Sequence, residues 1–321
     1  MSEKLPIALL APLPGQAEET LADRFEVRVH RGAPLHSEAE VAAFVGNAVG
    51  AITLLANPVG EHVLEACPSL RVVANCAVGF DNIDLEAARA RGVWVTNTPD
   101  VLTEATADLA WALILAVTRR VVEADRFLRE GRFQGWGLEL LLGSGLQGKV
   151  LGIVGFGRIG RAVAERGRSF AMEVAYHDPQ GPAEAQPWAR SLALEELLAT
   201  SHVLSLHCPL NDATHHLLDE RRLRLLPRGA YVINTSRGPV VDEAALVRVL
   251  SDGHLGGAGL DVYEHEPTVD PGLVGRQDVV LLPHIGSATL ETRAAMAELA
   301  AANLCAVLDG QEPPTALVRG R

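Results

Sequence analysis

The segment from Val150 to Gly160 constrains the fold of this chain more than any other stretch. It reads VLGIVGFGRIG, a short apolar run followed by three glycines spaced G-x-G-x-x-G, and a helical pattern continues to Phe170. In a βαβ unit the first glycine permits a tight turn, and the second lets a pyrophosphate approach the backbone. The third lets helix and strand pack closely, and the N–H groups at the helix start bind phosphate. The strand before and the helix after favour a dinucleotide site over a simple tight turn.

An acidic residue follows the next apolar run at the spacing that a dinucleotide site requires. The run Glu173–Tyr176 is followed by His177, Asp178 and Pro179. In dinucleotide-binding folds an acid about 20 residues beyond the glycines hydrogen-bonds the ribose 2′-OH. A carboxylate there repels a 2′-phosphate, so the sequence favours NAD(H) and leaves NADP(H) as the alternative. The alternative is that Asp178 has only a structural role, as a turn residue at the end of a strand.

Short runs rich in Val, Ile and Leu alternate with helical patterns along most of the chain. The expected strands are 7–10, 51–55, 71–74, 93–95, 150–154, 173–176, 203–206, 230–233, 257–260 and 279–282. The expected helices are 37–45, 84–91, 158–170, 242–250 and 290–308, with a longer helical stretch from about Leu102 to Arg129. Continuous apolar strands that alternate with helices indicate parallel sheets covered on both faces, which is the α/β class.

The length and the polar breaks indicate two domains. A chain of 321 residues accommodates two domains of ordinary size. Breaks at 96–100 and 283–288 precede long helical stretches. We therefore expect two Rossmann-like domains. Residues 1–99 with 289–321 would form a smaller, flavodoxin-like and discontinuous substrate domain, and 100–288 an NAD-binding domain.

Charge and cysteine content exclude several classes of protein. The net charge of −12 argues against a nucleic-acid partner, which requires a basic surface. The longest uncharged apolar stretch, Leu109 to Val117, is shorter than the roughly 20 residues of a membrane span. Residues 1–6 lack the pattern of a signal peptide. The four cysteines are scattered, without metal-ligand spacing, which predicts no metal site and a reducing, cytoplasmic location.

Three charged or titratable residues each follow an apolar strand of the second half of the chain. They are Arg237, Glu266 and His284. Open α/β sheets bind ligands beyond the carboxyl ends of their strands, so these side chains are candidates for a site. Reduction of a 2-keto acid needs a proton donor, and His284 fits that role near neutral pH, with Glu266 favouring the imidazolium. Arg237 offers a planar set of donors for a carboxylate and a carbonyl oxygen. Taken singly, each has a structural alternative: a core histidine, a loop ion pair and an ordinary turn.

Several motifs, taken together, resemble the D-isomer-specific 2-hydroxyacid dehydrogenases. They are Gly155–Gly160, the segments 234–238 (NTSRG), 259–262 (GLDV), 266–267 (EP) and 283–287 (PHIGS). The segments 75–84 (NCAVGFDNID), 97–103 (NTPDVLT) and 313–315 (PPT) are most similar to the glyoxylate/hydroxypyruvate reductase branch. The resemblance covers nearly the whole chain and implies a reductase of small 2-keto acids that forms a homodimer, and Asp178 favours NADH as its cofactor.

The resemblance also assigns residues. It implies that Arg237, Glu266 and His284 are the catalytic set. The implied cofactor contacts are Thr106, Gly155, Phe156, Gly157, Arg158, Ile159, Gly160, Asp178, Cys208, Pro209, Thr235, Ser236, Asp261 and Gly286. The N–H groups of Val78 and Gly79 are implied to receive the substrate carboxylate, next to Arg237 and His284. Leu55 and Trp136 are weaker candidates for the pocket wall, with interdomain core as the alternative.

Departures from related families narrow the function without fixing the substrate. The loop at residues 77–79 has no lysine, which disfavours a phosphite dehydrogenase, and Glu266 stands where formate dehydrogenases have glutamine. NADPH-dependent reductases of this branch often have a basic residue where this chain has Asp178. The alternatives are a D-lactate or D-glycerate/phosphoglycerate type of dehydrogenase, and a non-enzymatic NAD-sensing protein of the same fold. A Rossmann-fold enzyme that catalyses a different reaction is a further alternative, with less support from the sequence.

Overall fold

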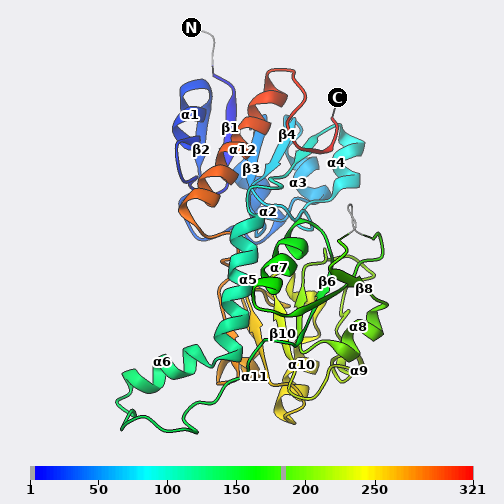
Figure 1. Ribbon diagram of the computed structural model, residues 1–321. Helices are drawn as coiled ribbons and strands as arrows, with labels where there is room; N and C mark the ends of the chain where they lie inside the picture. The colour runs from blue at the N-terminus through cyan, green and yellow to red at the C-terminus, as the bar shows by residue number, and fades with distance from the viewer. Residues whose placement is uncertain (1–3, 182–185, 321) are drawn as a thin grey trace. The chain divides into compact units, whose positions relative to one another are not determined.

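The chain packs into two compact units in the computed structural model (Figure 1). One unit is Thr103–Gly286, and the other is Met1–Leu102 together with Ser287–Arg321. The structure describes residues 4–181 and 186–320, so residues 1–3, at the start of the predicted smaller domain, and 321, at its end, lie outside it, as do 182–185. The smaller unit is discontinuous in sequence, as expected. The predicted domains 1–99 with 289–321 and 100–288 stay a prediction, because packing alone does not assign a role to either part.

The larger unit is built on a seven-stranded parallel sheet in the order β12-β11-β10-β9-β6-β7-β8. From β8 to β11 this is the 3-2-1-4-5-6 order of the Rossmann fold, with β12 added at one edge. The strands are β6 (Val150–Val154), β7 (Glu173–His177), β8 (Ala189–Ser191), β9 (Val203–Leu206), β10 (Tyr231–Asn234), β11 (Gly257–Leu260) and β12 (Val279–Leu281). The strand order reverses between β6 and β9, and sheets of this kind bind their ligands at that point.

Helices cover both faces of this sheet, which explains why its central strands are apolar along their whole length. One face packs against α5 (Thr103–Thr118) and α7 (Arg158–Ser169). The other packs against α8 (Leu194–Thr200), α9 (Glu220–Leu223), α10 (Glu243–Ser251) and α11 (Pro271–Val274). A short 3₁₀ turn, η1 (Gly238–Val240), follows β10, and α6 (Val121–Arg129) follows α5.

The smaller unit has a six-stranded sheet in the order β13-β5-β4-β3-β1-β2. Its strands are β1 (Pro6–Leu9), β2 (Glu26–Val29), β3 (Gly50–Thr53), β4 (Val72–Asn75), β5 (Trp94–Thr96) and β13 (Ala316–Val318). Five are parallel in the flavodoxin-like order 2-1-3-4-5, and β13 is antiparallel to β5. One face packs against α2 (Glu38–Val45), α3 (Glu61–Ala66) and α4 (Leu85–Arg91), and the other against α1 (Ala17–Arg24) and α12 (Leu290–Leu308). The predicted α/β class with two such sheets is confirmed.

Polar side chains fix several helix starts where the sequence predicts them. Ser37 forms a capping box with Glu40 at the start of α2. Asp84 and Asp242 accept N–H groups from the first turns of α4 and α10. Each cap satisfies a donor that has no partner inside the helix, so these boundaries are encoded locally.

The expected helical stretch from Leu102 to Arg129 consists of two helices. The chain forms α5 and α6, separated at Arg120, whose φ of 53° is left-handed. The Thr118 carbonyl accepts the N–H of Ser144 instead of continuing the helix, and the Thr118 hydroxyl bonds back to Ile114. These tertiary and side-chain bonds end α5, and α6 starts in a new direction (Figure 1).

None of the helices in the described part of the chain has the length and apolar character needed to span a membrane.

Candidate functional site

Arg237, Glu266 and His284 all lie beyond the carboxyl ends of neighbouring strands in the larger unit. Arg237 follows β10, Glu266 follows β11, and His284 follows β12. Because β10, β11 and β12 are parallel neighbours, their carboxyl ends meet at the same edge of the sheet. The strand order therefore brings the loops of these three residues together.

His284 and Glu266 form a hydrogen-bonded pair. The distance between His284 Nδ1 and Glu266 Oε2 is 2.8 Å, and Glu266 Oε1 accepts the N–H of Tyr263 at 3.1 Å. Burial alone would raise the pKa of Glu266. The hydrogen bond and charge of His284, the Tyr263 N–H and the Arg237 charge together hold that pKa below its usual value. Glu266 is therefore a carboxylate at neutral pH, and its bond to Nδ1 leaves Nε2 as the ring nitrogen outside this pair.

A buried carboxylate holds the loop that carries His284. Asp261 is 1% exposed, and its two oxygens accept the N–H groups of Ile285 and Gly286, each at 2.7 Å. The Asp261 carbonyl accepts the N–H of His284 at 2.9 Å. His284 has a φ of 54°, which is costly for a residue with a side chain and persists only where the surroundings enforce it. Asp261 supplies that enforcement.

The loops of Arg237 and Glu266 are in direct backbone contact. A Cβ atom on Gly238 would lie 1.8 Å from the backbone of Tyr263, so no larger residue fits at this point. The guanidinium of Arg237 donates to the carbonyl of Ser236 at 2.7 Å. Gly238 is the only trace of this contact in the local sequence. The glycine alone does not show that Tyr263 is the residue it contacts.

The glycine-rich turn has the geometry that its spacing predicts. Gly155 has a φ of +87°, and a Cβ on Gly160 would lie 2.0 Å from the Gly155 carbonyl. A Cβ on Gly157 would meet nothing within 4 Å, so the backbone there is open to a ligand. Arg158 and Ile159 begin α7, where the first N–H groups have no partner inside the helix. Phe156 differs: its ring is 1% exposed and stacks on Tyr176, so its side chain belongs to the core.

Asp178 lies next to this turn. Its Oδ2 accepts the N–H of Phe156 at 2.8 Å, and its Oδ1 accepts the N–H of Gln180 at 3.0 Å. Each carboxylate oxygen can accept two hydrogen bonds, so Asp178 keeps acceptor capacity for a hydroxyl. The structure thus joins the two parts of the predicted dinucleotide site.

Three buried hydroxyls in the described part of the chain have no hydrogen-bond partner, and one of them, on Thr235, directly follows β10. Thr235 Oγ1 is buried without a hydrogen-bond partner among the described residues, whereas Ser236 Oγ donates to Asn234 at 2.8 Å. Unpaired buried polar atoms are rare in proteins and point to a missing ligand or water. Together with the open backbone at Gly157 and the free capacity of Asp178, Thr235 fits the binding of a dinucleotide.

The other residues expected to contact a cofactor lie around these groups or farther along the same edge. Thr106 is 5% exposed, and a Cβ on Gly286 would lie 3.6 Å from its methyl group and 3.2 Å from Asp261. Cys208 and Pro209 follow β9, and burial raises the pKa of the Cys208 thiol to about 11. Cys208 therefore remains a neutral thiol.

The remaining predicted residues are elsewhere. Leu55, Val78 and Gly79 are half-buried residues of the smaller unit, in the loops after β3 and β4. Trp136 belongs to the larger unit and is 81% exposed. In the described part of the chain, no group of three or more His, Cys, Asp or Glu side chains could hold a metal.

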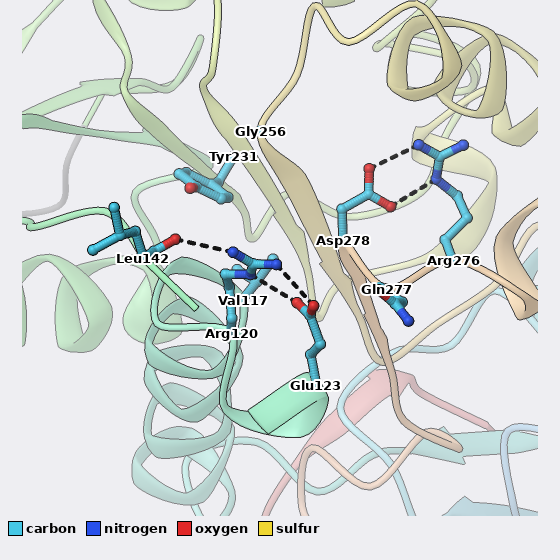
Figure 2. A pocket seen from close by; sticks show the side chains of 10 residues that line it. Val117, Arg120, Glu123, Leu142, Tyr231, Gly256, Arg276, Gln277 and Asp278 are labelled. Atoms are coloured by element: carbon cyan, nitrogen blue, oxygen red, sulfur yellow. Dashed lines mark hydrogen bonds and ion pairs between the residues drawn. The ribbon is translucent and has the colours of Figure 1, made fainter. Parts of the chain in front are cut away.

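A cavity of about 590 Å³ lies away from these residues (Figure 2). Its wall includes Tyr231, Gly256 and Asp278, which stand at the amino-terminal ends of β10, β11 and β12. Two ion pairs line it, Arg120 with Glu123 and Arg276 with Asp278. Because its charges are already paired and it is at the opposite end of the strands, this cavity is not the candidate site.

A protein-family model matches more than half of the chain. Residues 111–286 match the model described as "D-isomer specific 2-hydroxyacid dehydrogenase, NAD binding domain". The matched region spans β6 to β12 and therefore includes Arg237, Glu266 and His284.

Curated proteins and solved structures are similar over nearly the whole chain. A glyoxylate reductase of Thermococcus litoralis is 49% identical over 290 residues, which is 88% of this chain and 86% of that protein. One of Aeropyrum pernix is 48% identical over 275 residues, 83% of this chain and 82% of that protein. An NADPH-dependent glyoxylate/hydroxypyruvate reductase of Sinorhizobium meliloti, solved with NADP and malonate, is 35% identical with a TM-score of 0.88 and covers 99% of both chains.

Proposed function

This chain belongs to the D-isomer specific 2-hydroxyacid dehydrogenase family, and from that premise we propose that it reduces glyoxylate and hydroxypyruvate to 2-hydroxy acids, with NADH as the preferred cofactor. It is an NAD(P)-dependent oxidoreductase that acts on a small keto or hydroxy acid. The single observation that carries the proposal is the His284–Glu266 pair at 2.8 Å, on the sheet edge that also carries Arg237.

His284 is proposed as the acid of the reduction. When bound, the nicotinamide supplies a hydride to the carbonyl carbon of the keto acid. The electron pair of the C=O π bond moves to the oxygen, which takes the proton from His284 Nε2. The imidazole becomes neutral and regains a proton from solvent. Glu266 places its negative charge beside the ring and fixes the ring's orientation through Nδ1.

Arg237 and the loop after β4 are proposed to bind the substrate anion. The guanidinium of Arg237 holds the carboxylate and polarises the carbonyl, where negative charge develops during hydride transfer. The N–H groups of Val78 and Gly79 receive the carboxylate, and Leu55 contributes to the pocket wall.

The proposed cofactor contacts are the turn and the surrounding side chains described above. They are Thr106, Gly155, Phe156, Gly157, Arg158, Ile159, Gly160, Asp178, Cys208, Pro209, Thr235, Ser236, Asp261 and Gly286. Phe156 contributes through its backbone, since its ring is in the core. Asp261 has both oxygens bonded to the His284 loop, so a carboxamide would use its remaining lone pairs.

The activity is tested by loss of NADH absorbance in the presence of glyoxylate, hydroxypyruvate, pyruvate and a phosphorylated three-carbon keto acid. With glyoxylate or hydroxypyruvate we expect a kcat of about 1 to 10³ per second, the usual range for an enzyme on its own substrate. Faster turnover of pyruvate would favour the D-lactate type. Binding of NADH without turnover of any keto acid would overturn the proposal.

The preference for NADH rests on Asp178. Its carboxylate stands next to the glycine turn, where the ribose binds in this fold, and a like charge beside the 2′-phosphate of NADPH costs several kcal/mol. The Sinorhizobium meliloti relative is NADPH-dependent, so membership of the family does not fix the cofactor, and the proposal rests on the residue at position 178.

We expect kcat/KM to be about 100-fold higher with NADH than with NADPH. Replacement Asp178→Ser should narrow the ratio to less than tenfold by removing the repulsion, with the activity on NADH falling at the same time. A wild-type preference for NADPH would refute the argument from Asp178, while leaving the reduction itself intact.

The domain roles and the assembly are also proposals. We assign substrate binding to residues 1–99 with 289–321, cofactor binding to 100–288, and the protein to the cytoplasm.

A homodimer is supported by α6 and the segment after it, which extend from the larger unit (Figure 1). No residue of α6 is buried. The exposed large apolar side chains of α6 and the segment after it are Val121, Val122, Leu128, Phe133, Trp136, Leu138, Leu140 and Leu142. A second copy would cover an apolar surface that is otherwise costly in water.

Light scattering after size-exclusion chromatography should give a mass near twice the 34.2 kDa of the chain. The double replacement Leu128→Glu and Trp136→Asp should shift it to the monomer, because charges would be buried in the contact. The replacement Leu290→Glu, at a site 87% exposed outside this segment, serves as the control and should leave the mass unchanged.

A further inference from the structure

The loop after β4 carries three successive carbonyl groups that each accept a hydrogen bond from the smaller unit. The Ala77 carbonyl accepts the N–H of Thr98 at 2.8 Å. The Val78 carbonyl accepts Nδ2 of Asn97 at 2.8 Å, and the Gly79 carbonyl accepts Nδ2 of Asn75, also at 2.8 Å. Two of the three donors are therefore asparagine side chains.

These bonds fix the direction of the N–H groups that follow each carbonyl. In a trans peptide the C=O and the next N–H point in opposite directions. The donors stand at the carboxyl end of β4 and just after β5, so the N–H groups of Val78, Gly79 and Phe80 point away from that end of the sheet. No hydrogen bond among residues 4–181 and 186–320 uses these three N–H groups. Successive N–H groups with a common direction form a concave site for an anion.

Both asparagines are themselves held in place. Asn75 is fully buried, and its Oδ1 accepts the Thr53 hydroxyl at 2.9 Å. The carbonyl of Asn97 accepts the Thr315 hydroxyl at 2.6 Å and Nδ2 of Asn303 at 3.3 Å. Asn303, also fully buried, lies on α12, and Thr315 directly precedes β13. The end of the chain thus supports the loop through Asn97.

We propose that Asn97 and Asn75 are positioning residues that aim three N–H groups, those of Val78, Gly79 and Phe80, at the carboxylate of the substrate. The inference rests on the proposed function for the identity of the anion, and it adds Phe80 as a third donor. Phe80 contributes its backbone only. Asn97, Asn303 and Thr315 do not touch the substrate and act through the loop.

The test compares Asn97→Leu, Thr315→Val and the control Val41→Ala. Asn97→Leu keeps the approximate size and removes the donor to Val78. Thr315→Val removes one support of Asn97 and leaves Nδ2 in place. Val41 is fully buried against the same sheet and has no polar contact with the loop, so Val41→Ala reports the effect of destabilising the smaller unit alone.

We expect Asn97→Leu to raise KM for glyoxylate and the inhibition constant of malonate by about tenfold each, the effect of one hydrogen bond in a ligand site. The Kd for NADH should stay within twofold and kcat should fall less than KM rises. Thr315→Val should raise KM by about two- to fourfold. Val41→Ala should lower the melting temperature without changing KM.

Selective ¹⁵N labelling of phenylalanine tests the third donor directly. The chain has 7 phenylalanines, and a Phe80→Leu variant identifies the signal of residue 80. Malonate should move the Phe80 amide proton downfield, as expected for a new charge-assisted hydrogen bond. An unmoved Phe80 signal at saturating malonate would remove Phe80 from the site.

The outcomes separate this inference from the proposed function. If Asn97→Leu resembles Val41→Ala, with lower stability and unchanged KM and malonate inhibition, the asparagine is structural and the inference is overturned. If the wild-type protein reduces no keto acid but binds malonate, and Asn97→Leu weakens that binding measured by calorimetry, the proposed function fails and the positioning role stands. If the wild-type protein neither reduces a keto acid nor binds malonate, both fail.

Discussion

Replacement His284→Ala is expected to lower kcat for glyoxylate reduction by about 10²- to 10⁴-fold, the usual contribution of a general acid. The proton that the carbonyl oxygen needs would then come from water, which is a weaker and unpositioned acid. The Kd for NADH should change little. The measurement is steady-state kinetics at neutral pH together with NADH binding by fluorescence.

A second histidine of the larger unit provides a matched control. His216 also has a left-handed φ, of 48°, and its Nε2 lies 2.7 Å from a carboxylate oxygen of Glu264. His216→Ala therefore removes the same kind of His–Glu pair and places alanine in the same kind of backbone conformation. We expect it to reduce kcat less than tenfold. Equal losses in the two variants would mean that the backbone, and not the acid, is responsible.

The partner of His284 is tested by Glu266→Gln. The glutamine keeps the size of the side chain but removes the negative charge next to Nδ1 of His284. Because the carboxylate is assigned to hold the ring in the orientation that proton transfer needs, kcat for glyoxylate reduction should fall by about tenfold to 100-fold, while the Kd for NADH stays unchanged. A kcat equal to that of the wild type would contradict the assigned role of the carboxylate.

Replacement Arg237→Leu is expected to lower kcat/KM by about 10²- to 10³-fold, as for loss of a donor to developing negative charge. The guanidinium is assigned to both the carboxylate and the carbonyl oxygen, so KM should rise and kcat should fall. Arg237→Lys keeps the charge but not the planar pair of donors, and it should recover only part of the loss.

The control for this variant lies at the opposite end of the same sheet. Arg276 forms an ion pair with Asp278 at 2.7 Å in the wall of the cavity (Figure 2). Arg276→Leu removes an arginine of the same unit outside the candidate site, and kcat/KM should stay within threefold. If Arg237→Leu had an equally small effect, Arg237 would belong to the structure of its loop.

The sequence is informative about the centres of the sheets and much less so about their edges. The ten strands expected from apolar runs all exist, and three of them, β6, β9 and β11, have the expected bounds. The three unpredicted strands, β2, β8 and β13, are edge strands, whereas the fourth edge strand, β12, has an apolar run and is one of the expected strands. The three are short and partly exposed, as in the Glu26–Val29 segment, so they lack the continuous apolar run that identifies a buried strand.

The candidate site shows the same division. The glycine spacing and Asp178 identify the dinucleotide turn from local sequence, because each residue type is required by the backbone or ligand next to it. The contacts that hold the loops of the site in place cannot be recognised from the local sequence. Nothing in the sequence near Asp261 indicates that its oxygens hold Ile285 and Gly286, and nothing near Asn97 indicates that it holds Val78. These contacts join segments that are distant in the chain.

The sequence by itself determined which segments are buried strands, where the glycine turn lies, and which side chains have the chemistry for proton transfer and anion binding. Local periodicity and residue type suffice for this, because burial and backbone conformation act over a few residues. Only the tertiary structure decided that His284 and Glu266 are 2.8 Å apart. It also decided that the three successive carbonyl groups of residues 77–79 each accept a hydrogen bond from the smaller unit. Such distances depend on the order in which parallel strands pair, and pairing order is a property of the whole sheet.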